Sequence, residues 1–217
     1  MSHIVVFQGD SITDGNRTRD PRDFWDLNHY LGHGYAQMVA ARLGADHPDR
    51  DFIFHNRGVT GNRILDMYAR WREDAMNLNP DTISILIGVN DCGSEINGGI
   101  GSDAARFERI FRMLLDETRA ARPAINLIIM EPFILPCGLV GEKFDEWHAL
   151  ITPIQQILPS IARDYNATYI PLQQLFNDLC QKREASYWLW DGVHPTAAGH
   201  EIITRQWIEA FEAQNTI

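Results

Sequence analysis

Five short apolar runs, rich in β-branched and aromatic residues, constrain the fold of this chain more than any other feature. Continuous runs of this kind are typical of strands buried on both faces, as in a parallel sheet. The runs are Ile4–Phe7, Phe52–Phe54, Ile83–Ile87, Leu127–Met130 and Thr168–Ile170. Apolar residues at helical spacing fill the stretches between them, so strand and helix alternate along the chain.

Four stretches outside the apolar runs have apolar residues at helical spacing. An i, i+3, i+4, i+7 stripe predicts a helix from about Ser102 to Arg122; its members are Phe107, Ile110, Phe111, Leu114, Leu115 and Thr118. Similar spacing predicts a helix around Tyr35–Leu43 and a C-terminal one around Ile203–Phe211. The stretch Phe144–Tyr165 also indicates a helix, which Pro153 and Pro159 should kink or divide.

The alternation has no internal repeat and no flexible linker. It therefore predicts one three-layer α/β/α domain over residues 1–217, with a five-stranded parallel sheet. Ligands of such sheets gather at the carboxyl ends of the strands, so we expect the chemistry to lie directly after each apolar run.

Charge and cysteine usage narrow the function classes. The 19 basic and 29 acidic residues give a net charge of -10, which disfavours nucleic acids and anionic membrane surfaces as partners. The one basic spot, Arg17, Arg19 and Arg22, is diluted by Asp20 and Asp23. The cysteines, Cys92, Cys137 and Cys180, are odd in number and lack metal-type spacing, which favours free thiols. Without a secretory signal pattern or a membrane-length apolar run, we expect a cytoplasmic protein.

The first apolar run is followed by Gly9-Asp10-Ser11-Ile12-Thr13-Asp14-Gly15. A serine on a glycine-flanked turn at the start of a helix can expose its hydroxyl and offer its own N–H to an oxyanion. The structural alternative is that Ser11 only caps the next helix. The segment matches neither a phosphate-binding loop nor a dinucleotide turn, and the chain has no Gly-x-Ser-x-Gly nucleophile elbow.

The next two runs are followed by groups that can stabilise negative charge. Gly58, in Asn56-Arg57-Gly58-Val59-Thr60-Gly61-Asn62, lets the backbone approach a ligand with its N–H available. Asn90, in Gly88-Val89-Asn90-Asp91, is a neutral donor at a strand end. A turn glycine and an Asx-turn are the structural alternatives.

Near the C-terminus stands Trp190-Asp191-Gly192-Val193-His194-Pro195. An acid three residues before a histidine can accept the Nδ1 proton and turn Nε2 towards a nucleophile. Together, Ser11 as nucleophile, His194 as base, Asp191 as its orienting acid, and Ser11, Gly58 and Asn90 as oxyanion donors provide what acyl transfer needs.

These residues resemble the SGNH hydrolases, also called the GDSL esterase/lipase family. The four blocks of that family are marked by Ser, Gly, Asn and His, which appear here as Ser11, Gly58, Asn90 and His194, and its acid matches Asp191. The resemblance spans Gly9 to His200, with Ile12 in place of the Leu that the name implies. It implies a flavodoxin-like fold and no need for a metal or cofactor. Within the family, the chain most resembles acetylxylan-esterase-like enzymes, which implies a short-acyl ester on a sugar.

Several residues are candidates for a supporting role. Asp10 adjoins Ser11 and is a candidate for substrate binding. We expect its carboxylate instead to accept a hydrogen bond within the turn. Trp190 is the favoured substrate contact, because aromatic faces stack on sugar rings. Specificity is expected from three loops: Asn16–Gly34, with Phe24, Trp25 and Tyr30; Cys92–Gly101; and Tyr187–Trp190. Trp188 and Trp190 could equally be core or interface residues. Arg57, Asn62 and Arg63 either line the pocket or lie on solvated loops.

Three alternatives stay open at this point. A lysophospholipase or thioesterase would use the same machinery on a different acyl group. A metal-dependent phosphoesterase would use Asp10, Asp14, Asp191 and His194 as ligands, but the pattern is incomplete for a hard cation. A non-catalytic carbohydrate-binding domain would keep the aromatics without needing the Ser, His and Asp. Exposed aromatics and glycine-rich loops would also suit a homo-oligomer.

Overall fold

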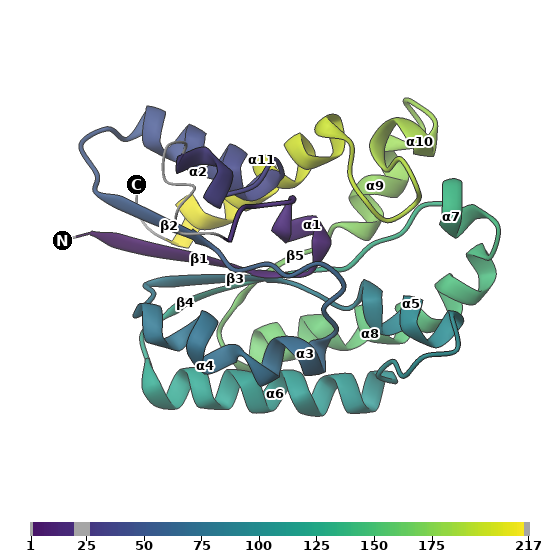
Figure 1. The fold of residues 1–217 in the computed structure, drawn as a ribbon, viewed down its shortest axis with the longest axis horizontal. Helices are drawn as coiled ribbons and strands as arrows, with labels where there is room; N and C mark the ends of the chain where they lie inside the picture. Colours follow the sequence, from purple (N-terminus) through teal and green to yellow (C-terminus); the bar gives the residue numbers. More distant parts are fainter. Residues whose placement is uncertain (1, 20–26, 215–217) are drawn as a thin grey trace.

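Five parallel strands form the centre of the molecule, in the order β2-β1-β3-β4-β5 (Figure 1). The computed structural model describes residues 2–19 and 27–214. Its strands are β1 (His3–Gly9), β2 (Phe52–Asn56), β3 (Thr82–Leu86), β4 (Asn126–Met130) and β5 (Thr168–Ile170). All four neighbouring pairs are parallel, and each strand overlaps one of the predicted apolar runs. The prediction of a five-stranded parallel sheet is therefore confirmed.

Burial along the strands follows their place in the sheet. All five residues of the central strand β3 are buried, whereas the edge strand β2 keeps Ile53 38% exposed. A strand covered by helices on both faces has no side facing solvent, which explains why the run that predicted β3 is apolar apart from the buried Ser84.

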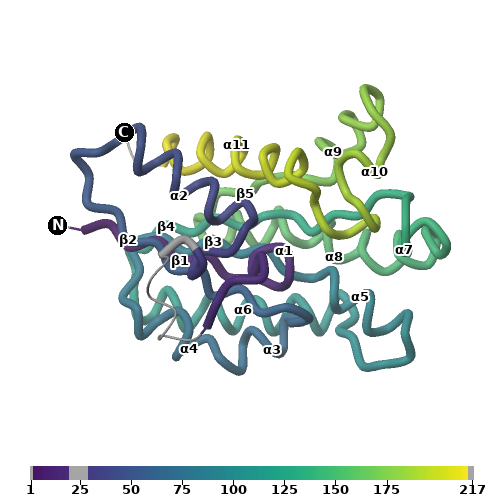
Figure 2. The backbone as a smooth tube through the Cα atoms, turned by 45° about the horizontal axis from the view of Figure 1, so that its top comes forward, coloured from purple at the N-terminus to yellow at the C-terminus, as the bar shows by residue number. Residues whose placement is uncertain are grey.

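Helices cover both faces of the sheet. One layer contains α2 and α11, which lie side by side, and the other contains α3, α6 and α8 (Figures 1 and 2). The bounds of these helices are α2 Tyr35–Asp46, α3 Ile64–Ala69, α6 Ala104–Ala121, α8 Phe144–Asp164 and α11 Ala197–Gln214. The shorter elements are α1 Ser11–Asp14, η1 Leu27–Tyr30, α4 Trp71–Asp74, η2 Met76–Leu78, α5 Val89–Ile96, α7 Gly138–Gly141, α9 Gln173–Leu179 and α10 Ala185–Trp188.

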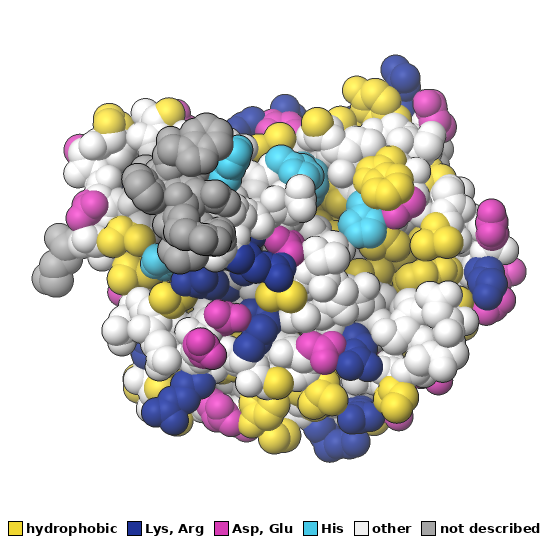
Figure 3. Space-filling model, viewed as in Figure 1, with side chains coloured by type: hydrophobic (Ala, Val, Ile, Leu, Met, Phe, Trp, Pro, Cys, Tyr) yellow, Lys and Arg dark blue, Asp and Glu magenta, His cyan; other side chains and the backbone are white. Residues whose placement is uncertain are grey.

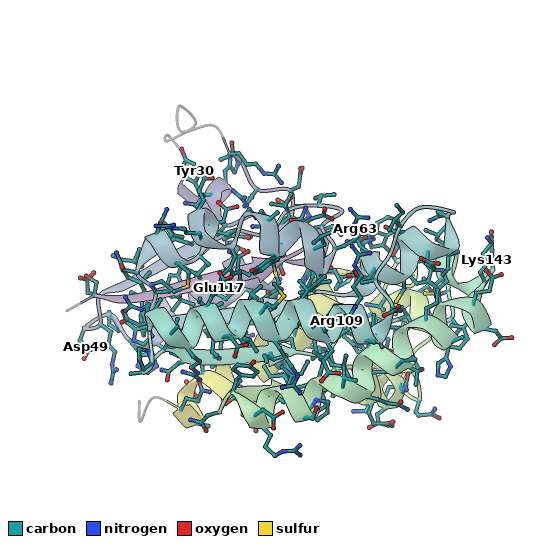
Figure 4. The ribbon with its side chains drawn as sticks, turned by 90° about the horizontal axis from the view of Figure 1, so that it is seen from below. Tyr30, Asp49, Arg63, Arg109, Glu117 and Lys143 are labelled. Atoms are coloured by element: carbon teal, nitrogen blue, oxygen red, sulfur yellow. The ribbon has the colours of Figure 1, made fainter. Side chains whose placement is uncertain are left out.

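The predicted stripe on α6 is its buried face. Phe107, Phe111 and Leu114 are fully or almost fully buried, and Asp103 caps the helix by accepting a hydrogen bond from the backbone N–H of Arg106 at 2.7 Å. Seen from below, α6 runs from Arg109 towards Glu117, away from the end of the molecule that carries Lys143 (Figure 4).

Helix α8 is continuous from Phe144 to Asp164, with Pro153 and Pro159 inside it. Division of this helix, one of the two outcomes expected from its prolines, does not occur. Both prolines lie on the exposed side, while the opposite side packs on the core through Trp147, Ile151, Ile154, Leu158 and Ile161. Each proline removes one backbone donor, and the packing of this stripe outweighs that loss.

Two further features bear on the sequence predictions. All three cysteines are free, with Cys92 buried and Cys137 and Cys180 partly buried. Across residues 2–19 and 27–214, no helix is both long enough and apolar enough to span a bilayer.

Candidate functional site

The turn after β1 places Ser11 at the first position of α1. Gly9 has φ +158°, and a Cβ there would lie 2.3 Å from Thr13 Oγ1 and 2.4 Å from the carbonyl oxygen of Leu86. Only glycine fits this close approach. Asp10 is the N-cap of α1, because its carboxylate accepts the backbone N–H of Ile12 at 3.0 Å. The turn that follows β1 therefore ends with a half-buried Ser11.

Ser11, His194 and Asp191 form one hydrogen-bonded chain. Ser11 Oγ lies 2.8 Å from His194 Nε2, although the two residues are 183 positions apart. His194 Nδ1 lies 2.7 Å from Asp191 Oδ2. The other carboxylate oxygen of Asp191 accepts the backbone N–H groups of Val193 at 3.0 Å and His194 at 2.7 Å. The acid is thus held from two sides, and its orientation fixes the plane of the imidazole.

The electrostatics of this chain suit proton transfer. The hydrogen bond to Asp191 raises the pKa of His194 above its usual value, against the opposing effect of burial. Burial alone would raise the pKa of Asp191, but hydrogen bonds from the side chain and backbone of His194 and from the backbone of Val193 outweigh it and keep that pKa low. A histidine beside an ionised acid is a stronger base, and its imidazolium form is stabilised.

The loop that carries Asp191 is anchored by α7 and the segment before it. The backbone N–H of Leu135 donates to the carbonyl of Gly192 at 2.9 Å, and that of Val140 to the carbonyl of Asp191 at 3.2 Å. Gly192 has φ +92°, and a Cβ there would lie 2.5 Å from the carbonyl oxygen of Cys137. A single bridge, Leu189 to Pro195, closes the loop. These contacts hold the acid and the histidine in one rigid turn.

Trp190 and Trp188 occupy opposite environments. Trp190 is 61% exposed, and its ring stacks on the imidazole of His194 with 5.4 Å between centroids and 18° between planes. Trp188 is 9% exposed and belongs to the core. Of the two readings for this pair, the core reading holds for Trp188, whereas Trp190 presents an aromatic surface beside the histidine.

Gly58 and Asn90 lie where the sequence places them, at the ends of β2 and β3, but their donors are partly engaged. The N–H of Gly58 donates to Asn56 Oδ1 at 2.9 Å, so it is not the vacant donor that the sequence suggested. The reason is that Asn56 is buried, with its NH₂ group bonded to the carbonyls of Thr13 at 2.6 Å and Leu31 at 2.8 Å, which leaves its oxygen facing Gly58. One N–H of Asn90 donates to the carbonyl of Asn62 at 3.1 Å.

Asp10 and Asp14 are buried beneath this surface. Burial raises the pKa of Asp10 to about 7. Being 1% exposed and engaged as a helix cap, Asp10 is a turn acceptor with no surface to offer a substrate. Asp14 accepts the N–H and hydroxyl of Thr60, each at 2.9 Å, and pairs with Arg19 at 2.6 Å. Among the described residues, no three His, Cys, Asp or Glu side chains are grouped so as to hold a metal ion.

The basic residues near the site are largely tied to neighbours. Arg17 donates through Nε to the carbonyl of Gly58 at 3.1 Å, and burial lowers its pKa to about 10. Arg63 pairs with Asp66 at 2.8 Å, whereas Arg57 is half-buried and its Nε has no hydrogen-bond partner among the described residues. Lys and Arg side chains gather near the middle of one face with acidic ones beside them (Figure 3). Arg22, Phe24 and Trp25, from the predicted basic spot and specificity loop, lie outside the described residues.

Sequence reasoning missed two residues that organise the site. The sequence pattern assigns no role to Asn56 or to Arg70. Arg70 donates to five oxygens from three segments of the chain, Gln8, Gly9, Arg57, Asn62 and Asp74. No local pattern signals such contacts, because Arg70 and Gly9 lie 61 positions apart.

Comparison with known proteins agrees with this geometry. The chain is 31% identical over 209 residues to an acetylxylan esterase of Geobacillus stearothermophilus, covering 94% of this chain and 91% of that one. The structure of the acetylxylan esterase Axe2 from the same organism matches with a TM-score of 0.82 at 29% identity, over 96% of this chain and 93% of that chain. A Parabacteroides merdae protein described as a GDSL-like lipase matches with a TM-score of 0.90 at 30% identity, over 96% and 94% of the two chains.

The profile of the GDSL-like lipase/acylhydrolase family matches residues 7–202, a span that includes Ser11, Gly58, Asn90, Asp191 and His194. This match covers most of the chain. The family hydrolyses acyl esters, and the relative from Geobacillus stearothermophilus is likewise named as an esterase. The chain therefore belongs to the GDSL-like lipase/acylhydrolase family and is a carboxylic-ester hydrolase.

Proposed function

We propose that Ser11, His194 and Asp191 are the catalytic triad of a serine esterase that removes short acyl groups, chiefly acetyl, from carbohydrates. The observation that carries this proposal is the unbroken hydrogen-bonded chain from Ser11 Oγ through both ring nitrogens of His194 to Asp191. Nucleophile and base lie within hydrogen-bond reach, and the base is oriented by a third group, as covalent acyl transfer requires.

The reaction proceeds through an acyl-enzyme. His194 Nε2 takes the hydroxyl proton of Ser11 as Oγ bonds to the ester carbonyl carbon. The resulting tetrahedral oxyanion collapses, the bond to the alcohol oxygen breaks, and His194 returns the proton to the leaving alcohol. Water then repeats the cycle: His194 takes its proton, the hydroxide oxygen attacks the acyl carbon, and Ser11 leaves with the proton restored.

Oxyanion stabilisation is assigned to the N–H of Ser11, the side-chain amide of Asn90 and the N–H of Gly58. Because the N–H of Gly58 already donates to Asn56, an oxyanion must share that N–H. The N–H of Ser11 and the amide of Asn90 therefore provide most of the oxyanion stabilisation. Loss of one such donor costs about 10²–10³ in turnover in comparable sites, which is the effect expected for Asn90→Ala.

Trp190 supports a sugar as the alcohol part of the substrate. Its exposed ring lies alongside His194, where the leaving alcohol must receive its proton. An aromatic face in that position can stack on the apolar face of a pyranose. The relative named an acetylxylan esterase agrees with this substrate class.

Initial rates on p-nitrophenyl esters from acetate to palmitate test the proposal, with wild type and Ser11→Ala measured side by side in EDTA. We expect a steep preference for acetate that disappears in the variant. Acetylated xylo-oligosaccharides would then be assayed with wild type and Trp190→Ala, where a higher KM is expected for the sugar but not for p-nitrophenyl acetate. A maximum at medium or long chains would indicate a lipase or thioesterase instead, and activity surviving Ser11→Ala would refute the triad.

A further inference from the structure

We propose that Arg70 is a positioning residue that locks the oxyanion-hole loop, residues 57–62, against the nucleophile turn. Arg70 touches neither Ser11 nor His194 in any described contact, and it lies between helices α3 and α4. Its effect on the reaction is therefore indirect, through the peptide groups and side chains that it holds. The inference rests on the proposed function, because it assigns Arg70 to the oxyanion donors named there.

The guanidinium of Arg70 reaches both segments at once. On the loop side, Nη1 donates to the carbonyl of Arg57 at 2.7 Å and Nε donates to Asn62 Oδ1 at 2.7 Å. On the nucleophile side, Nη2 donates to the carbonyl of Gly9 at 3.3 Å, two residues before Ser11. One rigid, planar group thus spans the gap between the end of β1 and the loop that follows β2.

The bond to Arg57 controls the Gly58 donor directly. The carbonyl of Arg57 and the N–H of Gly58 belong to the same planar peptide unit, so holding the oxygen fixes the direction of the N–H. A cation on the carbonyl also polarises the peptide and strengthens the N–H as a donor. Asn56 accepts that N–H from the other side, and the two contacts together leave this peptide one orientation.

The hydrogen bond from Arg70 to Asn62 acts on the Asn90 donor indirectly, through Asn62. Asn62 uses its side-chain oxygen for Arg70 and its backbone carbonyl for one N–H of Asn90, at 3.1 Å. The amide of Asn90 has two hydrogens, so with one held by Asn62 the second is left for the oxyanion. Arg70 therefore bears on both Gly58 and Asn90 through the same short loop.

The remaining contacts keep Arg70 itself in place. The two hydrogens of Nη1 are shared among the carbonyl of Arg57, Gln8 Oε1 and Asp74 Oδ2, the last two each at 3.0 Å. Gln8 is fully buried in β1 and donates its own NH₂ to the carbonyl of Asp74 at 2.8 Å. The Arg70 side chain is 17% exposed. A lysine at this position has the charge but not the planar fork, so it can satisfy only part of this set.

Arg119 provides a matched control. It too is a half-buried arginine that holds backbone carbonyls, of Ile125 at 2.7 Å and Tyr165 at 3.1 Å. It lies two residues beyond Glu117, near the end of α6 that points away from Arg109 (Figure 4). Arg119→Met should reduce thermal stability much as Arg70→Met does, without contact with the site.

The test measures kcat and KM on p-nitrophenyl acetate for wild type, Arg70→Met, Arg70→Lys, Arg119→Met, Asn90→Ala and the Arg70→Met/Asn90→Ala double variant. A misplacement of about 1 Å in such a site costs about 10²-fold in rate, so Arg70→Met should lose about that factor in kcat with KM nearly unchanged. Arg70→Lys should recover part of the loss, and Arg119→Met should keep wild-type kcat. In the Asn90→Ala background, Arg70→Met should cost less than about 10-fold, because the two act through a shared donor.

Two outcomes would overturn the inference. One is a wild-type kcat in a folded Arg70→Met variant, which would leave Arg70 a purely stabilising role. The other is fully multiplicative losses in the double variant, which would show that Arg70 does not act through Asn90 and would refute the joint control of Gly58 and Asn90 by one loop. If Arg70→Met fails to fold, Asn62→Ala removes the Nε acceptor alone and must lower kcat without changing KM. Activity surviving Ser11→Ala would refute the proposed function, a result distinguishable from either outcome for Arg70.

Discussion

Replacing Asp191 by Asn tests the triad most sharply, because the structure dictates how the new side chain must lie. Asp191 accepts three hydrogen bonds, from the Nδ1–H of His194 and from the backbone N–H groups of Val193 and His194. An asparagine has only one acceptor oxygen, and the two fixed backbone donors require it. Its NH₂ group then faces Nδ1, which must become an acceptor and leave the ring proton on Nε2.

The size of the expected loss follows from that tautomer. With a proton on Nε2, the imidazole cannot take the hydroxyl proton of Ser11, although the 2.8 Å approach between them persists. The equivalent change in a serine protease lowers kcat by about 10⁴ with the geometry intact. The same factor here corresponds to about 5 kcal/mol of transition-state stabilisation. The fold should survive, because both backbone N–H groups keep their acceptor.

The pH dependence supplies an independent readout. The hydrolysis needs neutral His194, so kcat/KM must fall as the pH drops through the pKa of that residue. In the wild type, Asp191 raises the pKa of His194 above its usual value. The fall of kcat/KM on the acid side of the pH profile, its acid limb, should therefore occur at a correspondingly higher pH. Without the carboxylate charge, the limb of the residual activity should move to lower pH.

The assay is kcat/KM on p-nitrophenyl acetate from about pH 5 to about pH 9, with thermal melts of both proteins. Retention of more than about a tenth of wild-type kcat in Asp191→Asn would refute the role of Asp191 as the orienting acid. An acid limb at the same pH in both proteins would refute the assignment of His194 as the group that titrates.

Three further predictions concern close packing and a buried histidine. Gly58→Ala should lower the free energy of unfolding by about 1–3 kcal/mol, because its Cβ would lie 2.3 Å from the backbone nitrogen of Asp14. Gly44→Ala, at an exposed helical position with nothing within 4 Å, should instead raise it by about 0.5–1 kcal/mol; urea unfolding measures both. Burial lowers the pKa of His200 to about 4, and its Nδ1 accepts the N–H of Tyr35 at 3.2 Å. Below about pH 6.5 the unfolded chain therefore binds a proton that the folded chain excludes, so about 3 kcal/mol of stability should be lost by about pH 4. His200→Asn should flatten that part of the stability profile, and equal slopes for both proteins would contradict it.

Much of the fold could be read from the sequence because burial leaves a local signature. The five strands follow from short β-branched runs, and their parallel pairing follows from the helices between them. Helix α6 follows from one apolar stripe. The candidate nucleophile, acid and base could be named for a related reason. Parallel strands bring their carboxyl ends to one edge, so Ser11, Gly58 and Asn90 could be assigned to one site. His194 follows α10 rather than a strand, and it was assigned through its spacing from Asp191.

The tertiary structure alone decided how each group is used. Asn56 takes the N–H of Gly58, and Trp190 is exposed while Trp188 is buried. Arg70 bridges Gly9 and Asn62. Hydrogen-bond pairing and side-chain exposure depend on which distant segments come within about 3 Å of each other, and residue spacing along the chain carries no record of that distance. The sequence by itself determined the parallel sheet and the candidate nucleophile, base and acid. The tertiary structure determined which hydrogen-bond donors are engaged and which aromatic surface is exposed beside His194.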